Sequence, residues 1–199
     1  MSIKCTLLAV ALAAAPLAAL AGGSADAFYT NSNGKDGERS RGDGYGVRAT
    51  SDLNDMLQLS GLYQTGTQKA QTSGTKFDVD ELRVGITARH RVDTITLLGG
   101  IERVQYQVTE RGTSDAGSTR GFVAKVGAGT HVSKVALKAT AGYINLDNKT
   151  DGHEVEVSAA APLINQISGF ADYRYTRVKD NADATATDNL VRVGLRYAF

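Results

Sequence analysis

Apolar and polar residues alternate one for one along most of this chain. Within residues 82–89, every even-numbered residue is apolar: Leu82, Val84, Ile86 and Ala88. Residues 153–159 and 191–199 show the same alternation, with the apolar residues at odd positions. Successive side chains of a β-strand point to opposite faces, so a period of two predicts strands with one apolar and one polar face.

Ten segments share this pattern, and most span 9 to 13 residues. A tilted strand needs about 9–11 residues to cross a membrane, whereas strands of soluble sheets usually have about 5–6. The lengths therefore favour strands that span a membrane. The segments are 24–32, 44–50, 56–66, 77–89, 94–108, 119–130, 135–146, 153–161, 166–177 and 189–199.

The connections between these segments alternate between two kinds. Residues 33–43, 67–76, 109–118, 147–152 and 178–188 are polar and are predicted to be long loops, whereas 51–55, 90–93, 131–134 and 162–165 are short. Long loops on one side and short turns on the other are typical of outer-membrane barrels. The sequence thus predicts an all-β fold, a ten-stranded antiparallel transmembrane outer-membrane β-barrel, with both termini in the periplasm. An eight-stranded barrel is the alternative.

The N-terminal residues have the features of a secretory signal peptide. Lys4 precedes an apolar run, and a small-residue A-x-A site ends at Ala21. A second A-x-A site ends at Ala27, but cleavage there would remove part of the first strand. We expect cleavage after Ala21, which leaves residues 22–199 as the barrel. The mature chain then has no cysteine and equal numbers of acidic and basic residues, which argues against a nucleic-acid partner.

The polar face is rich in charge, and in a membrane barrel it faces the lumen. A soluble, lipocalin-like barrel would reverse the two faces, but the apolar face holds many alanines that would leave voids in a core. The fifth segment changes phase, which leaves two explanations open. A bulge at Glu102 and Arg103 would turn both charges inward, or the lower half of the strand ends there and the upper half stands above the membrane. The predicted interior charges are Arg48, Glu81, Arg83, Arg89, Glu102, Arg103, Lys125, Lys138, Glu154, Glu156, Asp172, Arg174, Arg192 and Arg196.

Ten strands enclose a space that side chains can fill, since open channels need about 16. Opposite charges in the lumen are expected to pair, because unpaired buried charge is expensive. We therefore expect a mostly plugged lumen and a structural or surface-interaction role. A narrow channel for small solutes or ions is the alternative, and a surface hydrolase ranks third.

The C-terminal segment resembles the terminal strand of outer-membrane barrel proteins. Its apolar residues alternate up to a final aromatic, at Val191, Val193, Leu195, Tyr197 and Phe199. The resemblance implies that the barrel-assembly machinery reads these residues, after periplasmic chaperones have delivered the chain. It also implies an outer-membrane location, with outer-membrane lipid and lipopolysaccharide as the surroundings of a monomer.

Three further stretches resemble small outer-membrane barrels of the xanthomonad type, once proposed as secreted quorum or immunity factors. They read Asp-Gly-Tyr-Gly-Val-Arg at 43–48, Leu-Ser-Gly-Leu-Tyr at 59–63 and Asp-Val-Asp-Glu-Leu-Arg-Val-Gly at 78–85. Leu82 stands where that family usually has an aromatic residue. The resemblance implies a barrel and a location, but no activity.

Candidate chemical motifs are sparse. His131 and Ser133 resemble the His-x-Ser pair of lipid A deacylases, yet no acidic residue follows before Asp147. Asp78, Asp80 and His153 are the residues closest to the acidic and His-Asp pairs of ten-stranded surface proteases. We therefore predict no enzyme, no cofactor and no metal. Two loop motifs, the tripeptide 41–43 (Arg-Gly-Asp) and the series Asp180, Asp183 and Asp188, are interpreted as solvated loop residues rather than an adhesive motif and a cation site.

Overall fold

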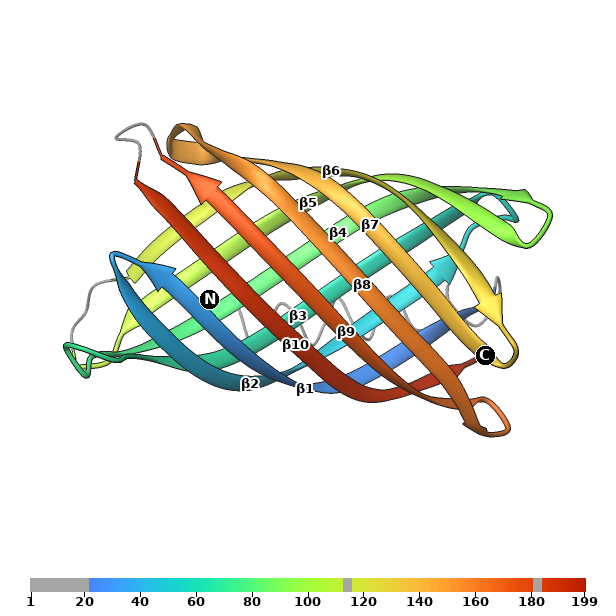
Figure 1. Ribbon diagram of the computed structural model, residues 1–199, viewed down its shortest axis with the longest axis horizontal. Helices are drawn as coiled ribbons and strands as arrows, with labels where there is room; N and C mark the ends of the chain where they lie inside the picture. Colours follow the sequence, from blue (N-terminus) through green and yellow to red (C-terminus); the bar gives the residue numbers. More distant parts are fainter. Residues whose placement is uncertain (1–21, 113–115, 181–183) are drawn as a thin grey trace.

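The computed structural model describes residues 22–112, 116–180 and 184–199, which form one closed barrel of ten antiparallel strands (Figure 1). The eight-stranded alternative is therefore wrong. The predicted signal peptide and Ala21 lie outside the described residues. Among the helices of the described residues, none is long and apolar enough to cross a membrane. The strands are β1 (Gly23–Asp36), β2 (Glu38–Asp52), β3 (Leu57–Ala70), β4 (Lys76–Val92), β5 (Ile95–Glu110), β6 (Ala116–Val132), β7 (Val135–Leu146), β8 (Thr150–Ile164), β9 (Ile167–Lys179) and β10 (Thr185–Ala198).

Each strand pairs with its neighbours in sequence, and β1 closes the barrel against β10. The closure continues to Phe199, whose backbone exchanges two hydrogen bonds of 3.1 Å with Gly23. Both ends of the described barrel chain thus lie at the end of the barrel that carries the tight turns. We call this the turn end, and the opposite end the loop end.

The four connections at the turn end confirm the predicted short turns. Asp93, Ser133 and Asn165 each begin a two-residue turn with a positive φ, between 47° and 57°. Aspartate and asparagine tolerate this left-handed conformation better than most residues. The turn between β2 and β3 is instead held by the Asn54 side chain, which accepts hydrogen bonds of 2.8 Å from the backbone N–H groups of Met56 and Leu57.

The predicted long loops are wrong in their conformation. Strand pairing continues through most of residues 33–43, and only Gly37 separates β1 from β2. A polar segment can extend an antiparallel ladder once both faces of the sheet are in water, because its backbone groups are then satisfied by pairing. Strands of 12 to 17 residues result, longer than the 9 to 13 that apolar alternation indicates.

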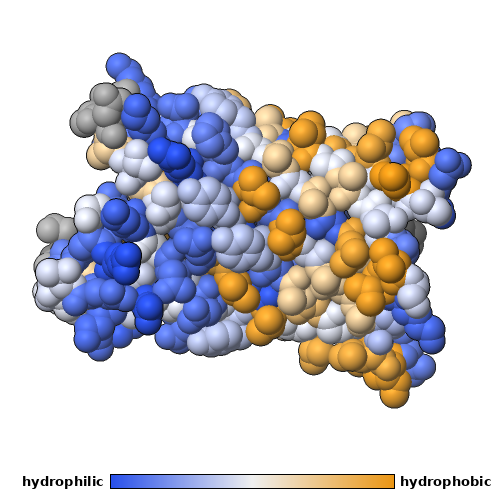
Figure 2. All heavy atoms as spheres, viewed as in Figure 1, coloured by the Kyte–Doolittle hydropathy of each residue, from blue (hydrophilic) through white to orange (hydrophobic). Residues whose placement is uncertain are grey.

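The outer surface is divided into two zones along the barrel axis. Figure 2 shows apolar side chains concentrated toward the turn end, in a zone that we call the apolar belt, and hydrophilic ones toward the loop end. Exposed aromatic residues stand at the borders of the apolar zone, as in a membrane girdle. Tyr29, Tyr45, Phe122, Tyr143 and Tyr173 lie on the loop side, and Tyr197 and Phe199 at the turn end.

Inside and outside exchange character at the loop end. Val104, Val123 and Ile144 are almost fully buried inside the barrel there, and Tyr106, Leu146 and Val178 pack against them. Where the wall is no longer in lipid, apolar side chains are stabilised inside and polar ones outside, as in a soluble protein. The barrel thus ends in a small apolar core beyond its apolar belt.

This exchange explains the phase change of β5. The ladders of β5 with β4 and β6 continue past Glu102 and Arg103 without a register shift, so the bulge is wrong, and the alternative explanation, that the apolar outer face ends at this point of an unbroken strand, agrees with the ladders. Glu102 faces the lumen, whereas Arg103 is exposed on the outer surface. The register shift that is present lies at Pro162 and Ile164 in the pairing of β8 with β9.

Candidate functional site

Four charged side chains meet in the middle of the lumen. Arg174 of β9 donates two hydrogen bonds of 2.7 Å to the Glu81 carboxylate of β4. Arg83 of β4 donates hydrogen bonds of 2.9 and 2.7 Å to Glu154 of β8, and its Nε also donates to Glu81. A separation of 3.8 Å between Arg174 Nε and Glu154 closes the ring. We call these four residues the lumen tetrad.

The lumen tetrad crosses the whole barrel. In the order of the ten strands, β4 and β9 stand five strands apart in either direction, on opposite walls. All four side chains are 5% exposed or less. Two further hydrogen bonds lie at the same height of the barrel. The Gln64 side chain donates one of 2.6 Å to Glu81, and the Tyr106 hydroxyl accepts one of 2.9 Å from Arg83. Paired charges therefore occlude the lumen at this height.

A second ionic cluster lies closer to the turn end. The fully buried Asp26 carboxylate accepts hydrogen bonds from Arg48 at 2.7 Å and from Arg196 at 2.8 and 2.9 Å. Arg48 also pairs with Asp172 at 3.1 Å, and Arg192 with Glu156 at 2.8 Å. This cluster links β1, β2, β8, β9 and β10 across the lumen.

Aromatic rings line the same part of the interior. Phe28 and Phe170 pack edge to face with ring centroids 6.2 Å apart, and Leu62 joins them. The guanidinium groups of Arg48 and Arg196 lie 5.1 and 5.5 Å from the Phe170 ring centroid. Such cation–π contacts favour a cation in a partly dehydrated site. The Phe170 ring therefore stabilises the charged guanidinium groups of Arg48 and Arg196 in addition to their acidic partners.

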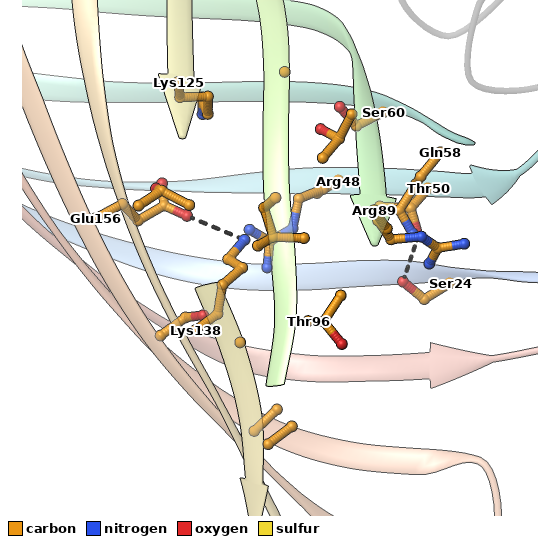
Figure 3. Close-up of a pocket in the computed structure, with 18 of the residues that line it drawn as sticks. Ser24, Arg48, Thr50, Gln58, Ser60, Arg89, Thr96, Lys125, Lys138 and Glu156 are labelled. Carbon is orange, nitrogen blue, oxygen red and sulfur yellow. Dashed lines mark hydrogen bonds and ion pairs between the residues drawn. The ribbon is translucent and has the colours of Figure 1, made fainter. Parts of the chain in front are cut away.

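A cavity of about 390 Å³ lies between the lumen tetrad and the turn end. Arg48, Lys125, Lys138 and Glu156 project into it from four different strands (Figure 3). Lys138 is 3.7 Å from Glu156, and Lys125 is 2.8 Å from Glu102. Ser24 and Thr50, hydrogen-bonded at 2.9 Å, line the cavity near the turn end. Its walls combine these polar and charged groups with apolar side chains such as Leu62 and Leu98.

The loop end is held together by Glu38. Its carboxylate accepts hydrogen bonds from the Ser73 hydroxyl at 2.7 Å and from the backbone N–H groups of Thr72 and Ser73 at 3.1 Å. The hydrogen bond from the Ser73 hydroxyl is the largest of the effects that lower the pKa of the Glu38 carboxyl. These contacts tie the tip of β1 and β2 to the connection between β3 and β4.

The predicted interior charges are found in these clusters, with two qualifications. Arg103 is exposed on the outside, and Arg89 lies near the turn end, 3.1 Å from Asp52. The others contribute to the ionic contacts of the lumen: Arg48, Glu81, Arg83, Glu102, Lys125, Lys138, Glu154, Glu156, Asp172, Arg174, Arg192 and Arg196.

Sequence reasoning missed Asp26, Phe28, Tyr106 and Phe170. Asp26 falls within the second A-x-A site, which obscured it, although its even position in β1 matches the inward face.

The predicted assembly residues lie on the outer face of β10, except Phe199, which follows the end of this strand. Val191, Val193, Leu195, Tyr197 and Phe199 are between 42% and 55% exposed.

The candidate catalytic residues are not brought together. Asp80 is hydrogen-bonded to the Tyr63 hydroxyl at 2.9 Å on β4, whereas His153 is exposed on β8, four strands away. Ser133 lies in the turn that follows β6, next to exposed His131, and Asp147 follows β7 at the loop end.

One of the two loop motifs differs from expectation. The tripeptide 41–43 lies within β2 rather than in a loop. Asp183 is outside the described residues, and within them no three His, Cys, Asp or Glu residues gather as a metal site.

A family model described as "Outer membrane protein beta-barrel domain" matches residues 5–161. No curated protein matches the sequence. Among solved structures, an outer-membrane channel from Pseudomonas putida F1 has a TM-score of 0.54 at 9% identity, covering 90% of this chain and 96% of that chain. The transport unit of the autotransporter AIDA-I from Escherichia coli has a TM-score of 0.53 at 12% identity, covering 89% and 90%. At these identities the likeness concerns the fold alone.

Proposed function

Because this chain belongs to the outer-membrane β-barrel domain family, we propose that it is a closed, non-enzymatic barrel with a structural or surface-interaction role. In this proposal the turn end faces the periplasm and the loop end faces the exterior. The apolar belt of the outer surface supports this placement in the membrane (Figure 2).

The lumen tetrad is the observation that carries the proposal. Its side chains join opposite walls and are almost completely buried. Separating Glu81 from Arg174 would remove the two short hydrogen bonds of the buried Arg174 guanidinium and leave it only the 3.8 Å contact with Glu154, which is expensive in a confined space. A barrel built in this way gains a rigid interior rather than a path for solutes. In this proposal, the surface available to partners is the polar part of the paired strands at the loop end.

A narrow channel is the second candidate, and the cavity of about 390 Å³ favours it. The cavity already provides a compartment with charged groups in its walls on the turn side of the lumen tetrad. Among the described residues, Arg174 Nε and Arg192 Nε are buried without hydrogen-bond partners. If the tetrad opened transiently, this compartment would connect to the exterior.

Conductance measurement separates the two proposals. We expect the refolded protein to give no stepwise current in planar lipid bilayers, whereas a Glu81→Ala/Arg174→Ala variant, which lacks the contact between opposite walls, gives small steps. Stepwise current from the wild-type protein would overturn the closed barrel in favour of the channel. The Arg111→Gln variant, altered at an exposed pair at the loop end, is the control.

The proposal includes a route to the membrane. Residues 1–21 direct export, periplasmic chaperones protect the chain, and the barrel-assembly machinery reads Val191, Val193, Leu195, Tyr197 and Phe199. In the membrane the barrel is a monomer surrounded by outer-membrane lipid and lipopolysaccharide, without cofactor or nucleic acid. The apolar side chains on the outer face of β10 are exposed, which supports the proposal that the assembly machinery binds this strand before the barrel closes.

A further inference from the structure

Two arginines stand side by side on the outer wall, at the loop-side border of the apolar belt. Arg103 of β5 lies opposite Phe122 of β6, and Arg120 is the next outward residue of β6 beyond Phe122. Both arginines are exposed. Diagonal neighbours of this kind in an antiparallel ladder are about 7–8 Å apart. Two flexible guanidinium groups at this spacing can reach a single ligand.

Neither arginine has a partner within the described part of the chain. Their cross-strand neighbours are Val84 and Phe122 for Arg103, and Gln105 for Arg120. Asp147, in the 3-10 helix η1 (Asp147–Lys149) that follows β7, makes no ion pair with Arg120 among the described residues. Charged residues nearer the loop end are engaged, since Asp80 accepts a hydrogen bond from Tyr63 and Arg111 pairs with Asp78.

The wall on the turn side of the two arginines is apolar. Val84, Ile101, Phe122 and Val126 are exposed there, between 43% and 68%. Asn145 of β7 lies opposite Phe122 and adds an exposed amide beside the arginines. The surface therefore carries a cationic, hydrogen-bonding border directly above a hydrocarbon-facing wall. This arrangement matches an amphiphile whose phosphate lies at the border and whose acyl chains lie along the wall.

We propose that Arg103 and Arg120 form a binding site for the phosphate of an outer-leaflet glycolipid. Guanidinium groups bind phosphate oxygens through paired, charge-assisted hydrogen bonds. Free phosphate could use only the two arginines, whereas a lipid also covers Phe122 and Val84. The proposed ligand is therefore a lipid and not free phosphate. The inference rests on the proposed function, because it requires the loop end to lie at the outer leaflet.

Lipid titration of the purified mature protein tests this site. Bisphosphorylated lipid A and its dephosphorylated form are added separately to the refolded barrel in neutral detergent, and bound lipid is counted by native mass spectrometry. We expect one tightly bound lipid A for the wild type. Loss of both charge-assisted contacts in Arg103→Gln/Arg120→Gln should weaken binding about tenfold or more. Dephosphorylated lipid A should bind the wild type about as weakly.

A matched control carries the same change in charge away from the border. Arg39→Gln/Arg41→Gln alters two exposed arginines near the tip of β2 and should leave lipid A binding unchanged. Equal binding by wild type and Arg103→Gln/Arg120→Gln, or an equal loss in the control, would overturn the site. Inorganic phosphate that competes as well as lipid A would overturn the commitment to a lipid. The titration is independent of conductance and of orientation in cells, so its failure is distinguishable from failure of the proposed function.

Discussion

Neutralising Glu81 should destabilise the barrel more than removal of a charge from its water-exposed surface. The Glu81 carboxylate accepts hydrogen bonds from Arg174, Arg83 and Gln64 and is 2% exposed. Glu81→Gln keeps the shape of the side chain but leaves Arg174 with Glu154 as its remaining acidic partner, which Arg174 then shares with Arg83. Removal of one partner of a buried ion pair typically costs about 3–5 kcal/mol in the free energy of unfolding. We expect a loss of this size, with Arg174→Gln similar.

The double variant provides the sharper test. Glu81→Gln/Arg174→Gln removes one acid and one base, and the contacts of 2.9 and 2.7 Å between Arg83 and Glu154 remain. Its loss of unfolding free energy should therefore be smaller than the sum of the single losses by roughly 1–3 kcal/mol. Additive losses would show that the two residues are not coupled as the structure implies.

Urea unfolding of the refolded protein in lipid vesicles measures these energies, with the folded fraction read from the mobility of unheated samples on gels. Arg111→Gln is the control, because its pair with Asp78 is exposed and such pairs contribute little. We expect its unfolding midpoint to match that of the wild type. Single lumen variants as stable as this control would refute the assignment of the tetrad as a stabilising plug.

Three further predictions follow from the wall, the closing strand and the N-terminus. Ile86→Arg puts a charge inside the apolar belt, one outward position closer to the turn end than Val84, and should reduce stability in lipid by about 2–4 kcal/mol, whereas Gln105→Arg, beyond the belt on β5, should have little effect; equal urea midpoints would contradict the assigned faces. Phe199→Ala should lower the amount of folded protein in outer-membrane fractions but not refolding in detergent; unchanged levels in cells would count against recognition of that residue. Mass spectrometry of the exported protein should find Gly22 as its first residue, since cleavage after Ala27 would remove Asp26 and leave Arg196 without its two hydrogen bonds; Phe28 as the first residue would contradict this.

The number of strands and the positions of the turns could be predicted because one apolar face per strand is enough to count strands. Leu82, Val84 and Ile86 show that face without any knowledge of their neighbours. The pairs inside the lumen could not be predicted. Glu81 and Arg174 are 93 positions apart, and only the closure of ten strands places them opposite each other.

The length of the strands was underestimated for a physical reason. Apolar alternation marks only the part of a strand that faces lipid, and Asn33 and Arg41 pair in β1 and β2 beyond it. The same boundary explains β5, where Val104 is inside and Arg103 outside although the phase of the strand is unbroken. The sequence alone left a bulge and a change of solvent along the barrel axis as equal explanations, because the alternation of residue types cannot distinguish them.

Epitope insertion at the two ends of the barrel tests the placement in the membrane most directly. An epitope placed after Gly37, between β1 and β2 at the loop end, adds chain where water can satisfy its backbone. One placed after Asn54 lies in the turn between β2 and β3, at the turn end. With antibody on intact cells, we predict staining at Gly37 and none at Asn54 until the outer membrane is permeabilised. Staining of intact cells at Asn54 and not at Gly37 would contradict the proposed orientation.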